Sequence, residues 1–184
     1  MALPAARSLA RAREGDLEAH EQLFRQYQNV VFTVARRILG CDHEAEEILQ
    51  ETFLEVFRSL SSMRRDASFA AWVRRIAARK AIDRLRREKL RRGAPIEEVP
   101  AGTGGGGPPT NPAPIGDCRI DLERALSELP ALARAVVWLF EVEGWTHAEI
   151  ARSTGRSVSF SKSQLARARV QLRRVLEHRE VRHG

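Results

Sequence analysis

The chain has 184 residues, a formal net charge of +7 and 43% hydrophobic residues, which suits one ordinary domain or two small ones and argues against wholesale disorder. No apolar run approaches the ~20 residues that cross a bilayer, and residues 1–14 lack the unbroken apolar core of a signal peptide. Cys41 and Cys118 are too few for a disulfide framework or a four-thiolate zinc site, so we expect a cytoplasmic protein whose positive charge favours a polyanionic partner.

Glycine and proline are concentrated in residues 93–116, including four consecutive glycines at 104–107. This composition forbids a regular helix and predicts a flexible linker. The linker divides the chain into a first lobe over residues 1–92 and a second lobe over residues 117–184. Apolar residues recur at three- and four-residue steps in both lobes, so the expected fold is all-α, with two small helical domains.

Three helices are predicted in the first lobe. One begins at Asp16 and ends at Gly40, and the next covers residues 42–60. A polar turn over residues 61–68 precedes the third helix, which begins at Phe69. Aromatic residues at helical spacing, such as those that open this third helix, are expected to belong to the core.

The second lobe contains the pattern of a helix-turn-helix. Helices are predicted over residues 117–128 and from Pro130 to about residue 143. Thr146 then opens a capping box before a short helix that ends near Gly155, and Ser157 can cap the last helix. Two short helices joined by such a turn match a DNA-reading motif, with an ordinary helical hairpin as the alternative.

The predicted helix over residues 42–60 is acidic in a basic chain. Its residues 42–55 contain six Asp and Glu and no Lys or Arg. An apolar leucine within its polar face suits a protein partner with a basic rim and an apolar spot. The alternatives are a solvated helix face and a metal site built on His43 and Glu47, which lacks a second ligand cluster. The polar face comprises Glu47, Gln50, Glu51, Leu54 and Glu55.

The third helix is strongly basic. Residues 72–92 contain ten Lys and Arg against two Asp and Glu. A face of this kind releases counterions from nucleic-acid phosphates, so we expect salt-dependent binding, with a merely solubilising surface as the alternative. Four of the basic residues recur at i, i+4, i+7 and i+11, and three more lie beside them. The four are Lys80, Arg84, Arg87 and Arg91, and their neighbours are Arg75, Arg79 and Arg86.

The first turns of the last helix are the expected reading end of the helix-turn-helix. In this motif the N-terminal residues of the second helix enter the major groove of duplex DNA. The candidate contacts are Arg156, Ser157, Ser159, Phe160, Lys162, Ser163 and Arg167.

Three segments, in this order around the linker, resemble the extracytoplasmic-function (ECF) group of bacterial RNA polymerase sigma factors. EAEEILQETFLEVFRSL resembles the segment that binds the polymerase clamp, and SFAAWVRRIAARKAIDRLRR resembles the helix that melts and reads the −10 element. The third segment, LSELPALARAVVWLFEVEGWTHAEIARSTG followed by KSQLARARVQLRR, resembles the helix-turn-helix that reads the −35 element.

The resemblance implies a non-enzymatic initiation factor whose partners are core RNA polymerase, duplex −35 DNA and melted −10 DNA. An anti-sigma protein is a common further partner in this family, and neither a cofactor, a metal nor a small-molecule substrate is implied. The acidic face would hold the polymerase, and the helix-turn-helix candidates would read the −35 element. The residues assigned to the −10 strand are Arg64, Arg65, Arg75, Arg79, Lys80, Arg84, Arg86 and Arg87.

The sequence departs from the family pattern at two places. The family often has Asn where Arg79 stands, and Ser159-Phe160-Ser161 replaces the usual Gly-Thr-Val. Phe160 then has two possible roles: it contacts a thymine methyl group, or it packs inward in place of the missing valine.

Two other classes of function compete with this interpretation. A stand-alone helix-turn-helix regulator explains the second lobe but not the acidic helix. An enzyme, such as a metal-dependent nuclease, would need a nucleophile, a ligand cluster or a phosphate-binding loop. The tetraglycine at 104–107 lacks the flanking strand and helix of such a loop.

Overall fold

The computed structural model describes residues 4–63, 68–92 and 123–183, and every regular element in these ranges is helical. This confirms the all-α prediction, whereas the predicted linker over residues 93–116 lies outside the described residues. The first lobe comprises α1 (Pro4–Arg13), α2 (Leu17–Leu39), α3 (Asp42–Ser59), the 3-10 turn η1 (Leu60–Ser62) and α4 (Phe69–Arg92). The second comprises α6 (Ala131–Val137), η2 (Trp138–Val142), α7 (His147–Thr154) and α8 (Val158–His183), with a helical turn before α6.

Helix α2 begins and ends where the sequence predicts. The Asp16 carboxylate accepts the backbone N–H groups of Glu18 at 2.9 Å and Ala19 at 3.2 Å. The Ala19 N–H bond, followed by Arg11, lowers the pKa of Asp16. At the other end, Gly40 adopts the left-handed conformation with φ of 78° and donates its N–H to the Arg36 carbonyl.

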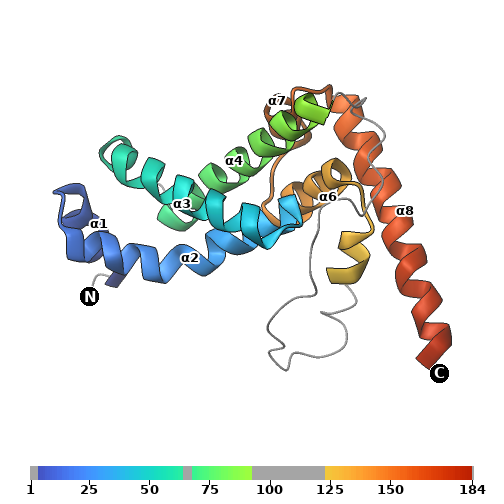
Figure 1. Cartoon of the computed structure of the whole chain (residues 1–184), viewed down its shortest axis with the longest axis horizontal. Helices are drawn as coiled ribbons and strands as arrows, with labels where there is room; N and C mark the ends of the chain where they lie inside the picture. The colour runs from blue at the N-terminus through green and yellow to red at the C-terminus, as the bar shows by residue number, and fades with distance from the viewer. Residues whose placement is uncertain (1–3, 64–67, 93–122, 184) are drawn as a thin grey trace.

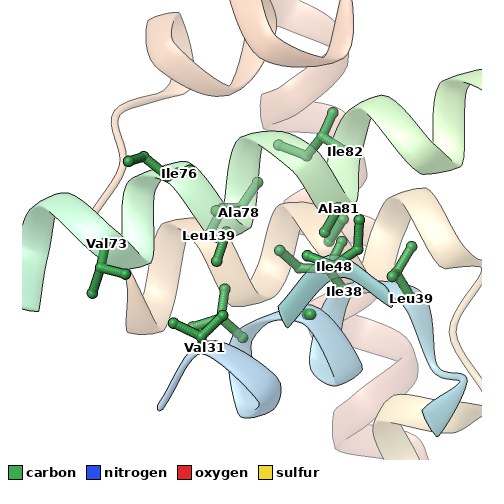
Figure 2. Close-up of a cluster of buried hydrophobic side chains, with 14 of the residues drawn as sticks. Val31, Ile38, Leu39, Ile48, Val73, Ile76, Ala78, Ala81, Ile82 and Leu139 are labelled. Atoms are coloured by element: carbon green, nitrogen blue, oxygen red, sulfur yellow. The ribbon is translucent and has the colours of Figure 1, made fainter. Parts of the chain in front are cut away.

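The two lobes share one hydrophobic core. Helix α2 packs against α3 and α4 on its own lobe and against α6 of the second lobe (Figure 1). Leu139 of η2 is fully buried in the same cluster as Val31 of α2 and Ala78 of α4 (Figure 2). Burying a leucine of this size contributes about 1.5–3 kcal/mol. The second lobe is therefore packed onto the first in this structure.

The helix predicted from Pro130 to residue 143 is interrupted. Pro130 has extended backbone and stands before α6, and the helix widens into a π-helical segment from Trp138. There the Glu143 N–H donates to the Trp138 carbonyl at 3.1 Å, a five-residue step. The wide turn ends at Gly144, whose φ is 68°. The side chain of Glu143 is thereby only 4% exposed.

An arginine of the second lobe caps a helix of the first. Arg134 of α6 donates from Nη2 to the carbonyl of Leu39 at 2.7 Å and more weakly to that of Ile38 at 3.3 Å. These carbonyls have no partner within α2, because they belong to its last turn. Burial, and secondarily the charge of Arg36, lowers the pKa of Arg134.

The close approach of Arg134 to Gly40 gives a stability prediction. A Cβ at residue 40 would lie 2.5 Å from the Arg134 Nη2 atom, and φ is +78°. Gly40→Ala should therefore lower the free energy of unfolding by about 2–4 kcal/mol in urea denaturation, through backbone strain and loss of the Arg134 cap.

Gly144→Ala is the matched control, because φ is +68° there and nothing lies within 4 Å of the added Cβ. It should cost about 1 kcal/mol, the strain alone. Equal losses for the two variants would contradict the role given to Arg134.

Candidate functional site

The acidic face of α3 lies against the basic face of α4. Glu47 forms an ion pair with Arg84, and Glu51 lies 3.7 Å from the same guanidinium. Lys80 lies 4.0 Å from Glu51. The acidic face of α3 and the basic face of α4, which the sequence assigns to different partners, therefore form ion pairs with each other within the molecule.

Glu55 is the most strongly engaged carboxylate of this group. It pairs with Lys80 at 2.9 Å and with Arg79 at 2.5 Å. Burial opposes its ionisation, but the Lys80 hydrogen bond and the charges of Lys80 and Arg79 outweigh burial and lower the pKa of Glu55. The carboxylate therefore stays ionised at neutral pH and holds α3 to α4.

Between these ion pairs, α3 keeps an apolar surface spot. Leu54 is 56% exposed, and Gln50 is exposed one turn before it. The carboxyl side chains of Glu47 and Glu51 are 41% and 45% exposed, so they still face solvent beside the leucine. The five residues predicted for a protein partner thus form one surface with an apolar centre and an acidic rim.

The basic residues of α4 fall into two groups. Lys80 and Arg84 turn toward α3 and are only 20% and 27% exposed. Arg75, Arg79 and the pair Arg86 and Arg87 are mainly exposed to solvent. Arg64 and Arg65, which the family resemblance also assigns to the −10 DNA strand, lie outside the described residues.

Arg74 and Arg75 of α4 contact the second lobe. Arg74 donates two hydrogen bonds to Glu143, at 2.9 Å and 3.0 Å. Arg75 pairs with Glu149 of α7 at 2.8 Å, and its guanidinium lies 5.8 Å from the centre of the Trp145 ring. The sequence does not predict this contact of Arg74, because it does not show which of the ten basic residues in 72–92 meets a carboxylate from the other lobe.

The second lobe contains the predicted helix-turn-helix. Thr146 and Glu149 form the capping box of α7, and the Thr146 bonds followed by Arg75 lower the pKa of Glu149. Gly155 ends α7 with φ of 67°, and the Arg156 N–H returns to the Ala151 carbonyl at 2.9 Å. Backbone hydrogen bonds thereby hold the turn between α7 and α8.

The first turns of α8 present the predicted polar surface. Ser157 caps the helix by accepting the Phe160 N–H at 3.0 Å. Val158, the first residue of α8, is 42% exposed and is an apolar candidate contact that sequence reasoning missed. The exposed residues predicted for this surface are Ser157, Ser159, Lys162, Ser163 and Arg167.

Ser161 stands where the family usually has valine. It is fully buried and bonds to Nδ1 of His147 at 3.0 Å, while His147 stacks on Phe140 with ring centres 4.5 Å apart. Phe160 is only half-buried and lies beneath the guanidinium of Arg156 at 5.5 Å. The alternative that Phe160 packs inward in place of the valine is therefore wrong.

Other kinds of site gain no support from the geometry. His43 lies 3.7 Å from Glu47, but across residues 4–63, 68–92 and 123–183 no three His, Cys, Asp or Glu gather as metal ligands. Within the same ranges no helix has both the length and the apolar character to cross a membrane. Cys41 is half-buried at the start of α3, and Cys118 lies outside the described residues.

Known families match both lobes of the chain. A family model described as Sigma-70 region 2 matches residues 23–91, and one described as Sigma-70, region 4 matches residues 119–172. The ECF RNA polymerase sigma factor SigM of Mycobacterium tuberculosis is 34% identical over 162 residues, which cover 88% of this chain and 79% of that protein. The chain belongs to the ECF family of RNA polymerase sigma factors.

Other relatives agree with this assignment. SigE of Mycolicibacterium smegmatis, also an ECF sigma factor, is 36% identical over 163 residues, covering 85% of this chain and 61% of that protein. The structure of the sigma factor RpoE in complex with the anti-sigma factor NepR from Bartonella quintana has a TM-score of 0.57 at 22% identity. That likeness covers 85% of this sigma factor and 96% of the other chain, and it shows a shared fold.

The α3–α4 ion pairs give a pH prediction. Because the folded pKa of Glu55 is lowered, its stabilisation is present above the unfolded value near 4.3 and is lost as the pH falls through the folded value. Glu55→Gln should cost about 0.5–1 kcal/mol of unfolding free energy at pH 7, and the difference from the unaltered protein should disappear as the pH falls through the lowered pKa of Glu55.

Thermal unfolding followed from pH 2 to 8 measures this difference. Glu46→Gln, at an exposed position of the same helix, is the control and should change little at any pH. A Glu55→Gln deficit that persists unchanged in acid would contradict the ion-pair origin.

Proposed function

We propose that this protein binds core RNA polymerase and directs it to promoters, where it takes part in DNA melting at the start of transcription. The observation that carries the proposal is the order of its parts: an acidic, leucine-centred face and a basic helix in region 2, followed by a helix-turn-helix in region 4. The activity is one of recognition, without a chemical step of its own. Family membership favours this function over a stand-alone regulator.

The exposed face of α3 is the proposed polymerase contact. Leu54 would enter an apolar spot on the polymerase, and Gln50 would bond beside it. Glu47, Glu51 and Glu55 would meet a basic rim through the parts of their carboxylates that face solvent. An apolar centre with a charged rim is the arrangement typical of protein interfaces.

The outer face of α4 is the proposed −10 contact. Arg79, Arg86 and Arg87 are exposed, and arginines of this kind bind the backbone of a single strand while its bases enter pockets. Unpairing those bases costs a few kcal/mol, which contacts to the separated strand must offset. Arg79 stands where the family often has Asn, so we propose that it binds phosphate or guanine at this point.

The start of α8 is the proposed −35 contact. Lys162, Ser163 and Arg167 are exposed on the first turns, where a recognition helix meets base edges in the major groove. Val158 and the outer part of Phe160 add apolar surface for thymine methyl groups. Each lobe needs only modest affinity for DNA, because polymerase and the chain itself hold both on one promoter. We also infer an anti-sigma protein as an inhibitory partner, since the fold matches a sigma factor solved with one.

Reconstituted transcription tests the function. Core polymerase with this chain should initiate on a subset of fragments from the source genome, and polymerase alone should not. Leu54→Ala should lower affinity for core polymerase about five- to tenfold, because the leucine is the apolar centre of the contact.

Leu17→Ala is the matched control, since Leu17 is an 80% exposed leucine on another helix. It should bind and initiate normally. Absence of initiation on every template would overturn the proposed function, whereas equal affinity of both variants would overturn the assignment of Leu54.

A second prediction concerns DNA binding by the helix-turn-helix. In holoenzyme binding to a promoter, Lys162→Ala should reduce the slope of log K against log salt by about 1, because one phosphate contact is lost. Arg25→Ala, at an exposed position of α2 paired with Glu21, should leave the slope unchanged. An unaltered slope for Lys162→Ala would remove this residue from the interface.

A further inference from the structure

A polar pair joins the two helices of the helix-turn-helix beneath its exposed reading surface. Ser161, in the first turn of α8, is fully buried, and its hydroxyl is hydrogen-bonded to Nδ1 of His147, the first residue of α7, at 3.0 Å. A hydroxyl both donates and accepts, so this bond forms with either tautomer of the imidazole. The start of α8 is therefore tied to the start of α7 through side chains.

The π-helical segment η2 holds the imidazole in place. The His147 ring stacks on Phe140 with 4.5 Å between the ring centres and 22° between the planes. The guanidinium of Arg169 lies 5.9 Å from the centre of the Phe140 ring and donates from Nε to Glu141 at 2.8 Å. Helix α8 thus has one polar contact near its start, through His147, and another about two turns later, through Glu141.

Between these two contacts the inner face of α8 is apolar. Leu165 and Ala168 are 4% and 1% exposed and belong to the hydrophobic core. Apolar burial is non-directional, whereas a hydrogen bond fixes both a distance and an angle. The bond between Ser161 and His147 is therefore a directional constraint at the end of α8 that carries the candidate DNA contacts. The exposed residues within two positions of Ser161 are Ser159, Lys162 and Ser163.

We propose that His147 and Ser161 are positioning residues for −35 recognition: their hydrogen bond sets the rotation and depth of the first turns of α8, and with them the bases that the exposed side chains reach. Hydrogen bonds to base edges tolerate little displacement, because they weaken steeply with distance and angle. Valine, usual in the family at residue 161, has no group for this bond, so the pair gives this chain a −35 preference of its own. The inference rests on the proposed function, since it assumes that α8 reads the −35 element.

Selection of a randomised −35 element by the holoenzyme tests the proposal. Threonine and valine have the same shape, so Ser161→Thr and Ser161→Val separate the hydroxyl from the space that the side chain fills. Ser161→Thr should select the same sequence as the unaltered chain. Ser161→Val should lose discrimination about fivefold or more at one or more base pairs of that sequence.

A double variant separates selectivity from stability. In His147→Phe, Ser161→Val both partners become apolar and an aromatic ring remains to stack on Phe140, so the melting temperature should stay within about 2–4 °C of the unaltered chain. Its −35 selection should nonetheless change as that of Ser161→Val does. A loss of selectivity in this variant is then not a consequence of unfolding.

Thr154→Val is the matched control. Thr154 is 6% exposed in α7 of the same motif, and its hydroxyl donates to the Ile150 carbonyl of its own helix at 2.7 Å. The substitution therefore removes a buried hydroxyl whose hydrogen bond lies within α7. It should lower the melting temperature by about 2–4 °C and leave the selected −35 sequence unchanged.

The outcomes distinguish this inference from the proposed function. Absence of any −35 preference in the unaltered holoenzyme would overturn the proposed function. A preference that is present in the unaltered holoenzyme and retained by Ser161→Val and by the double variant would overturn this inference alone. An equal loss of preference in Ser161→Thr or in Thr154→Val would also overturn it, because the hydrogen bond to His147 would then not be the cause.

Discussion

Helix α4 packs in the core although it carries a high positive charge, and carboxylates meet that charge on two sides. The helix carries apolar residues such as Ile76, Ala77 and Ala81 into the core, and its basic side chains surround them. On one side the carboxylates of α3 meet Lys80 and Arg84, and on the other Glu143 and Glu149 meet Arg74 and Arg75. Without these partners, the ten basic residues of α4 would repel one another along the helix.

This arrangement links the proposed functions of the surfaces. The carboxylates that would face polymerase also position the basic helix that would face DNA. A change at Glu47 or Glu51 therefore affects α4 as well as the polymerase contact, whereas Leu54 takes part in neither ion pair. A residue also has two roles at the contact between the lobes: Glu149 belongs to the capping box of α7 and forms an ion pair with Arg75 of α4.

Local features of the fold were predictable because they depend on neighbours in sequence. Asp16 and Gly40 mark the ends of α2 through their own backbone preferences, and the Thr146 capping box and Gly155 define α7 in the same way. The apolar spacing also identified Leu54 as an exposed leucine in a polar face. The helix α1 was missed, since it depends on contacts of Ala12 and Arg13 with the rest of the first lobe.

Features that depend on pairing across the chain were not predictable. Nothing local to Arg134 indicates that it caps α2 some 95 residues away, and nothing local to Trp138 indicates that the helix widens there. The burial of Ser161 likewise follows from the position of His147, which only the packed helix-turn-helix supplies. Positions of residues within the candidate surfaces could be predicted, but their partners could not.

Crosslinking from two exposed positions measures the central claim most directly. Arg87→Cys on α4 and Ser163→Cys on α8, each with Cys41 and Cys118 replaced by serine, would carry a photoreactive group in holoenzyme bound to a promoter. The account predicts that the α4 probe reaches the melted strand near −10 and that the α8 probe reaches duplex DNA near −35. Crosslinks of both probes to the same segment, or to none, would contradict it.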